Sequence, residues 1–308
     1  MITCWQNGGC DFWVRRKSVI KYCPESGGYG LVRANGETTS RSRSAAETAK
    51  LLREYKHILA NHSPIPEIGI LYDPDNSMQL FAMESSDDLY TQSHIGYYRT
   101  VWLRDLYARY VTYDTLDDLD GLKVLIAPMC LTLPDHVAKA IAEFVNSGGV
   151  LIAEARMGLF DHRGFNQPTL PIGILAKVVG AVEQEAICSD PENRPPLNNP
   201  NHEQWPDPID NGPTIVFSEP TSASFRARGF ICPLTPDQGR PIAESLGYCV
   251  AVTHHYGRGH AYYFGTYLGL ALAQQDTSAM SIMRTILDRH TSSKVRGNAL
   301  RPRLVDAG

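Results

Sequence analysis

A strand–helix–strand pattern between Leu122 and Ala155 constrains the fold of this chain more than any other stretch. Two short apolar runs, Lys123 to Pro128 and Gly149 to Ala153, have the composition of strands buried inside a parallel sheet. Between them, apolar residues recur with the period of one helical face: Val137, Ala140, Ile141, Phe144 and Val145. Parallel strands joined through a helix form a right-handed crossover, so this stretch predicts a βαβ unit.

Further elements extend this unit into an α/β domain that opens at Glu67. The sequence predicts a buried strand over Ile68 to Tyr72, a polar loop from Asp73 to about Gln79, an amphipathic helix over Ser93 to Tyr110 and a strand over Val111 to Tyr113. Strands that alternate with helices at this spacing are typical of a doubly wound sheet.

The C-terminal half is less regular. We expect a helix over Leu175 to Gln184, a proline-rich loop from Asp190 to Pro220, a hairpin over Gly247 to Gly265 and a last helix over about Ala279 to His290. The hairpin prediction depends on the turn that Tyr256 to Gly259 provide. A loop as long as the proline-rich one is usually functional or an interface.

Two segments flank the α/β domain. Before it, the sequence predicts a helix over about Ser42 to Leu59 and a linker over Asn61 to Pro66, which holds two prolines and no periodic pattern. After it, residues 291–308 form a polar tail.

Composition bounds the class of protein. The 308 residues are 43% hydrophobic and 20% charged, which is ordinary for a globular protein. The net charge of −4 comes without a basic block, which argues against nucleic acid as a partner. No apolar run approaches the roughly 20 residues that span a bilayer, and no signal peptide is visible, so we expect no membrane segment. Seven scattered cysteines without a CxxC pair favour a reduced, cytoplasmic setting.

A nucleophile is missing where this kind of sheet often carries one. Proteins of the class I glutamine amidotransferase-like fold place a nucleophilic cysteine on a tight turn after a central strand. The equivalent turn here, Ile152 to Gly158, contains no cysteine. The sequence therefore predicts that the amidotransferase nucleophile is absent.

Two other reactive side chains lie at strand ends, where α/β proteins place ligand contacts. Cys130 follows the strand before the helix, and either His136 or His255 is available as its base, although a small buried thiol is the simpler interpretation. Glu154 ends the second strand, and a structural ion pair with Arg156 or a neighbour is the simpler interpretation there. An independent hydrolase that uses Cys130 or Glu154 stays as an alternative.

Clusters of histidine and cysteine are weak evidence for metal binding in this chain, and His254 to His260 are weak evidence for a phosphate site because a hairpin turn accounts for the glycines there. His254 and His255 are adjacent on a predicted strand and point to opposite faces, so they do not share one ion. Cys4, Cys10 and Cys23 lack an evident fourth ligand. We therefore expect no metal and no cofactor.

Three stretches of the α/β domain carry a family resemblance: Gly121 to Pro128, Phe144 to Gly149 and His255 to Thr266. Together they resemble the trimerisation domain of the β-galactosidases of glycoside hydrolase family 42. Over residues 67–290, the resemblance implies a glutamine amidotransferase-like (flavodoxin-like) doubly wound sheet without the nucleophile. It also implies a homo-oligomer, most simply a homotrimer.

Residues 1–60 resemble the C-terminal end of that family's (β/α)8 glycosidase barrel. Trp5 matches a tryptophan of the sugar pocket on the final strand, and Glu25 matches the glutamate that holds galactose hydroxyls. Gln6 and Gly28 depart from the family pattern, which has arginine and histidine at these positions, so the resemblance leaves the sugar open.

The family's two catalytic glutamates lie on earlier barrel strands, upstream of the residues present here. The chain therefore resembles a fragment, the product of a late translation start, or a remnant. The leading hypothesis is a non-catalytic oligomerisation domain and barrel end of a β-galactosidase-like glycoside hydrolase, which acts on β-galactosides or related sugars only with a complete barrel. A non-catalytic carbohydrate-binding protein that uses Trp5 and Glu25 is a further alternative.

Overall fold

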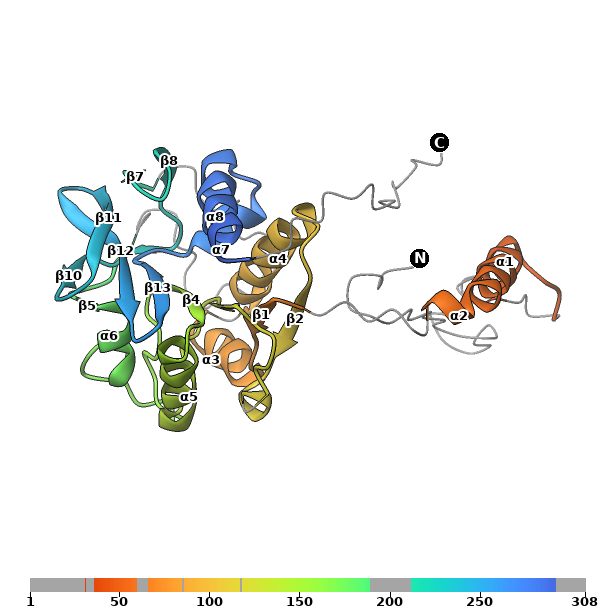
Figure 1. Ribbon diagram of the computed structural model, residues 1–308, viewed down its shortest axis with the longest axis horizontal. Coiled ribbons are helices and arrows are strands. Elements are labelled where there is room, and N and C mark those ends of the chain that lie inside the picture. The colour runs from red at the N-terminus through yellow and green to blue at the C-terminus, as the bar shows by residue number, and fades with distance from the viewer. Residues whose placement is uncertain are drawn as a thin grey trace. The chain divides into compact units, whose positions relative to one another are not determined.

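The computed structural model describes residues 31, 36–59, 66–84, 86–116, 118–188 and 212–291. The chain divides into two compact units, Met1–Ile65 and Pro66–Gly308 (Figure 1). Trp5, Glu25 and the three N-terminal cysteines lie outside the described residues, as do most of the proline-rich segment and the predicted polar tail.

The first unit contributes two helices, α1 (Ser40–Glu54) and α2 (Lys56–Leu59). Thr39 and Ser42 form a capping box, in which each hydroxyl accepts a hydrogen bond from the other residue's backbone N–H. The helix expected over Ser42 to Leu59 therefore begins two residues earlier and is interrupted at Tyr55.

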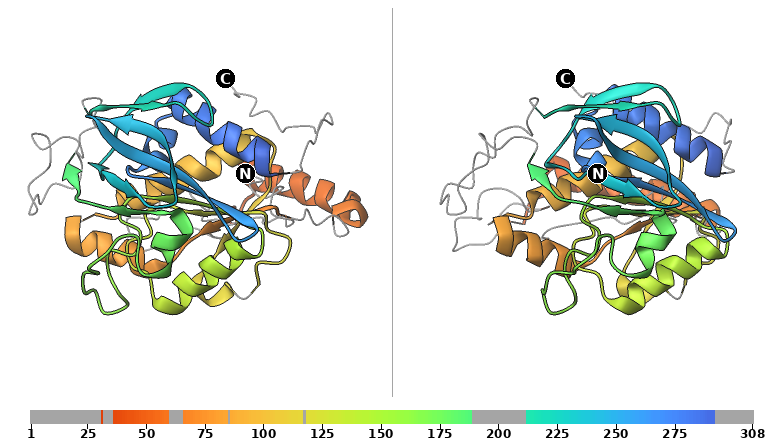
Figure 2. Two further views of the ribbon diagram at one scale, coloured as in Figure 1. Left: turned by 60° about the vertical axis from the view of Figure 1, so that its left-hand side comes forward. Right: turned by 90° about the vertical axis from the view of Figure 1, so that its left-hand side faces the viewer.

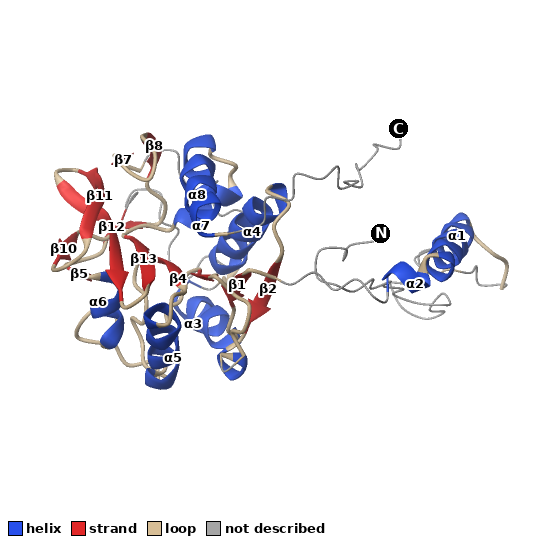
Figure 3. Ribbon diagram, in the orientation of Figure 1, coloured by secondary structure: helices blue, strands red, loops and turns tan. Residues whose placement is uncertain are grey.

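A nine-stranded mixed sheet forms the centre of the second unit (Figure 3). In spatial order, its strands are β2 (Ala108–Val111), β1 (Ile68–Leu71), β3 (Val124–Ala127), β4 (Val150–Glu154), β13 (Gly259–Phe264), β12 (Tyr248–Tyr256), β11 (Arg240–Ser245), β7 (Thr214–Phe217) and β8 (Ala223–Arg226). The pairings from β2 to β13 are parallel, and those from β13 to β8 are antiparallel.

Helices cover both faces of this sheet (Figure 2). They are α3 (Pro74–Glu84), α4 (Asp88–Leu103), α5 (Asp135–Asn146), α6 (Ile174–Val179), α7 (Leu268–Ala273) and α8 (Thr277–His290). One apolar core packs α4, α7 and α8 against the sheet, and a second packs α5 and α6 against the other face. Every residue of β1, β3 and β4 is buried, as expected for strands covered on both sides.

The βαβ unit predicted from Leu122 to Ala155 is present. Strands β3 and β4 pair in parallel with Val124 opposite Val150, and α5 connects them. Its predicted apolar stripe faces the second core: Val137, Ile141 and Val145 are fully buried, while Ala140 and Phe144 pack against the core half-buried.

Two predicted elements in the N-terminal part of the sheet were wrong. The segment expected as a polar loop from Asp73 is helix α3, because Pro74 and Asp75 suit a first helical turn. Among the described residues of this helix, Leu80 is the one buried apolar residue, with Met83 packed beside it, while Met78 and Phe81 face outward, so the apolar pattern of this helix is weak. Helix α4 begins at Asp88 and ends at Leu103, earlier than the expected end at Tyr110.

That early end changes the following elements. Asp105 adopts a positive φ of 56°, which breaks the helix, and the second strand then forms over Ala108–Val111 instead of Val111 to Tyr113. Tyr113–Thr115 form a short 3₁₀ turn. Trp102, near the end of α4, is 40% exposed.

In the C-terminal half, the predicted hairpin and last helix are present, but the helix predicted before them is shorter than expected. The helix expected over Leu175 to Gln184 ends at Gly180, whose left-handed conformation (φ 70°) caps α6. The next residues form β5 (Ala181–Glu183), which pairs with β10 (Leu234–Pro236). A second small sheet joins β6 (Ile187–Cys188) to β9 (Phe230–Ile231). The hairpin β12–β13 and the last helix α8 are confirmed.

None of the described helices is long and apolar enough to cross a membrane.

Candidate functional site

Glu154 is the most unusual side chain at the carboxyl end of the parallel strands, because its carboxylate is 1% exposed in the middle of the sheet. One oxygen accepts hydrogen bonds from the Tyr97 hydroxyl, at 3.0 Å, and from the Gly269 N–H. The other accepts from the Ser93 hydroxyl, at 3.2 Å, and from the Met129 N–H, at 3.0 Å. The carboxylate therefore joins β4 to α4, α7 and the segment after β3.

Burial and hydrogen bonding act on Glu154 in opposite directions. Burial raises the pKa of its carboxyl to about 7, and the four hydrogen bonds offset part of that rise. A carboxylate has about four acceptor positions, and four donors occupy them here. A group so buried and so fully bonded is a structural junction, and it has no open position for a substrate atom.

The ion pair expected between Glu154 and Arg156 is wrong. The donors to Glu154 are two hydroxyls and two backbone N–H groups, which satisfy the carboxylate without a cation. Arg156 instead lies over the ring of Phe230, at 4.7 Å from the ring centroid, and its backbone N–H donates to Glu183 at 2.6 Å.

Cys130 is a small buried thiol, which confirms the simpler of its two interpretations from the sequence. Its side chain is 3% exposed, and its sulfur lies 3.2 Å from the Tyr113 hydroxyl. Burial raises the pKa of the thiol to about 12, so the nucleophilic thiolate is not formed near neutral pH. His136 and His255, the two candidate bases, are both exposed to solvent, whereas the thiol is not.

The histidines of the hairpin behave as the strand geometry predicts. His254 and His255 point to opposite faces: His254 Nδ1 lies 3.0 Å from the Val178 carbonyl oxygen, and His255 faces a pocket. Across the hairpin, His255 pairs with His260, and their Nδ1 atoms are 3.2 Å apart. In the described part of the chain, no three or more His, Cys, Asp or Glu side chains converge to hold a metal ion.

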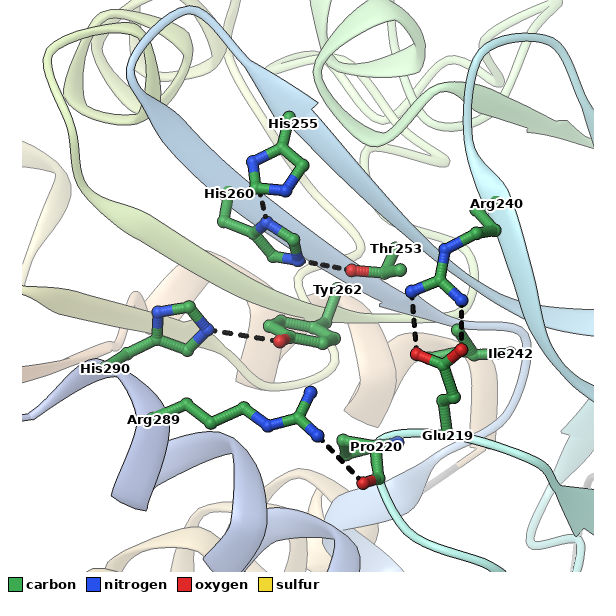
Figure 4. A pocket seen from close by; sticks show the side chains of 10 residues that line it. All are labelled: Glu219, Pro220, Arg240, Ile242, Thr253, His255, His260, Tyr262, Arg289 and His290. Carbon is green, nitrogen blue, oxygen red and sulfur yellow. Dashed lines mark hydrogen bonds and ion pairs between the residues drawn. The ribbon is translucent and has the colours of Figure 1, made fainter.

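The pocket next to this pair has a volume of about 230 Å³ (Figure 4). Its ionisable lining residues besides Tyr262 are Glu219, Arg240, His255, His260, Arg289 and His290. Burial, together with the neighbouring His255, His290, His254 and Arg240, lowers the pKa of His260 to about 4. Sequence reasoning found the hairpin histidines but missed the other members of the pocket, which come from strands and a helix far apart in the chain.

These observations define a three-layer α/β domain whose two reactive strand-end groups are both buried. The sequence model of the beta-galactosidase trimerisation domain matches residues 66–291, and the chain belongs to that family. Among curated proteins, none matches the chain.

Solved structures agree with the fold. A family 42 β-galactosidase from G. stearothermophilus matches with a TM-score of 0.70 and 20% identity, over 89% of this chain and 37% of its own. A β-galactosidase from the Antarctic haloarchaeon Halorubrum lacusprofundi matches with a TM-score of 0.66 and 20% identity, over 85% of this chain and 35% of its own. An exo-β-1,4-mannosidase from an Opitutaceae bacterium matches with a TM-score of 0.55 and 13% identity, over 86% and 42%. The chain thus spans less than half the length of these proteins.

Proposed function

We propose that residues 66–291 hold copies of this chain together as a homotrimer, in the cytoplasm, as the non-catalytic assembly part of a β-galactosidase-like glycoside hydrolase. The observation that carries the proposal is the match to the trimerisation domain over these residues. The burial of Cys130 and Glu154 supports a non-catalytic role for this part and weighs against an independent hydrolase that uses either residue.

The finer description of the sheet belongs to the same proposal. We infer a doubly wound, glutamine amidotransferase-like (flavodoxin-like) domain without its nucleophile. The spatial order β2-β1-β3-β4-β13 supports this description, because it follows the 2-1-3-4-5 order of flavodoxin-like sheets. The turn after β4, where the amidotransferase cysteine is expected, contains none.

The surface that best fits a subunit contact lies along α4 and the edge strand β2. Ile95 and Trp102 are 45% and 40% exposed on one stripe of α4. Half-buried Tyr98 on the same stripe stacks on Tyr110 of β2, at 6.2 Å between ring centroids, and Tyr72 packs edge-on against Tyr110 at 6.0 Å. We call these five residues the α4–β2 surface. Clustered exposed aromatic residues are typical of interfaces, and the edge strand offers unpaired backbone groups.

The first test is the mass of the assembly. At micromolar concentration, we expect sedimentation to give three times the 34.2 kDa chain mass. Trp102→Glu places a charge on the α4–β2 surface and should shift the parent assembly to monomers, with an unchanged circular dichroism spectrum.

Phe165→Glu is the matched control, because Phe165 is 64% exposed but lies outside the α4–β2 surface. It should leave the trimer intact. A parent chain that sediments only as a monomer would contradict the assembly role. A trimer that survives Trp102→Glu would contradict only the choice of surface.

The sugar contacts remain a proposal that depends on the family resemblance. We propose that Trp5 and Glu25 bind the hydroxyls of a β-galactoside or a related sugar when the barrel is complete. If the present chain keeps this affinity, galactose should change its tryptophan fluorescence, and Glu25→Ala should abolish the change while Glu47→Ala on α1 keeps it. No response in the parent would argue against sugar binding by this chain.

A further inference from the structure

We call the pocket beside His255 and His260 the histidine pocket. Four separate parts of the second unit meet there: the start of β11, the β12–β13 hairpin, the segment after β7 and the last turn of α8. Figure 4 shows Tyr262 in its centre, with Arg289 and His290 to one side and Arg240 and Glu219 to the other. The pocket lies outside the α4–β2 surface, and the trimer proposal does not use it.

The charges of the pocket do not balance. Glu219 is the one carboxylate among the described lining residues, and both of its oxygens are paired with the guanidinium of Arg240. Arg289 donates to the Pro220 carbonyl oxygen at 3.0 Å, an uncharged acceptor. With the imidazoles neutral, two guanidiniums and one carboxylate leave a net charge of +1 on the lining residues.

The polar atoms around this excess charge suit an anion. The Tyr262 hydroxyl lies 3.1 Å from His290 Nε2, and the Thr253 hydroxyl contacts His260 Nε2. Arg289 has five N–H donors and contacts both the Pro220 carbonyl oxygen and the Tyr262 hydroxyl, so further donors remain for a ligand. At about 230 Å³, the pocket is smaller than the roughly 300 Å³ at which sites for drug-sized ligands begin, so a small ligand fits best.

We propose that this pocket binds a small oxyanion, such as sulfate, phosphate or a small carboxylate, which contacts Arg289 and the neighbouring histidines while Glu219 holds Arg240 in position. Guanidinium and imidazolium groups form charge-assisted hydrogen bonds with oxyanions, and these are stronger than bonds between neutral groups. The ligand supplies the negative charge that the lining residues lack.

Binding of an anion should be linked to protonation of the histidines. The groups that face His260 are His255, Arg240, Tyr262 and His290, with His254 behind the strand and Arg289 beside His290. Burial and the positive charges among them disfavour the imidazolium, and a bound anion favours it. Sulfate should therefore bind more tightly at about pH 5 than at about pH 7, with uptake of protons.

The test is calorimetric titration of the whole chain with sulfate, which does not itself titrate in this range, at an ionic strength held constant with sodium chloride. We expect Arg289→Gln to weaken sulfate binding at least tenfold. Arg258→Gln, which removes an exposed arginine from the turn of the same hairpin, should leave it unchanged. Phosphate and citrate titrations then distinguish inorganic oxyanions from carboxylates as ligands.

A second variant keeps the proposal testable if Arg289→Gln disturbs α8. His290→Gln retains the guanidinium and should reduce the proton uptake on binding, as measured in buffers of different ionisation enthalpy. Equal sulfate affinity in the parent and in both variants, or no binding to the parent, would overturn the proposal. Either result would leave the assembly role untouched.

Discussion

Replacing Gly96 by alanine is expected to lower the free energy of unfolding by about 3 kcal/mol. Gly96 lies on α4 where that helix crosses α7, and an added Cβ would lie 2.1 Å from the Gly269 carbonyl oxygen and 2.6 Å from the Ala273 backbone nitrogen. Both are backbone atoms, so relief requires the helices to move apart. The higher helix propensity of alanine returns only about 1 kcal/mol.

The separation of α4 from α7 would also strain the hydrogen bond from Gly269 to Glu154. Urea denaturation followed by circular dichroism measures the loss. Thr91→Ala, at an exposed position of the same helix, is the control and should change stability by no more than about 0.5 kcal/mol. A loss below about 1 kcal/mol for Gly96→Ala would show that the crossing adapts more easily than its geometry indicates.

Glu154→Gln should destabilise the protein by an amount that depends on pH. The amide keeps the shape of the carboxyl but places N–H groups opposite a backbone donor, either that of Met129 or that of Gly269. One buried backbone N–H then loses its acceptor, which costs about 2 kcal/mol. We expect this deficit relative to the parent at about pH 5, measured by urea denaturation.

The deficit should shrink as the pH rises and disappear by about pH 8, because the parent loses stability and the variant does not. Burial raises the pKa of Glu154 from 4.5 to about 7, so folding favours its protonated form. That contribution is fully present below pH 4.5 and is lost as the pH rises to about 7, by about 3 kcal/mol. The exposed Glu185→Gln controls for loss of a negative charge. A deficit that stays constant from about pH 5 to about pH 8 would contradict this account.

Three strands of the parallel half of the sheet could be predicted because they are continuous apolar runs. Strands β1, β3 and β4 are buried at every position, and such runs are recognisable without knowledge of their neighbours. The antiparallel edge was missed for the opposite reason. Strand β7 alternates exposed and buried residues over only four positions and lies inside the stretch predicted as a proline-rich loop, so that prediction was wrong at Thr214–Phe217.

The junction at Glu154 was beyond sequence reasoning because its partners are distant in the chain. Ser93 is 61 residues away and Gly269 is 115 residues away, and neither carries a charge that would indicate a carboxylate partner. The sequence prediction therefore paired Glu154 with the nearby Arg156. The same limit applies to the pocket, where the sequence predicted the hairpin that carries His255 and His260 but nothing local indicated Arg240 or Arg289.

The inner face of helix α4 packs against the sheet, and its outer face belongs to the proposed subunit contact. This arrangement implies that folding precedes association. Its inner face holds Glu154 through Ser93 and Tyr97, while its outer face carries Ile95 and Trp102. The outer stripe exists as a continuous surface only after the inner contacts have fixed the helix on the sheet. If this face is the subunit contact, each protomer would therefore complete its own core before it binds another copy. A misfolded chain would lack the contact surface and would not join the assembly.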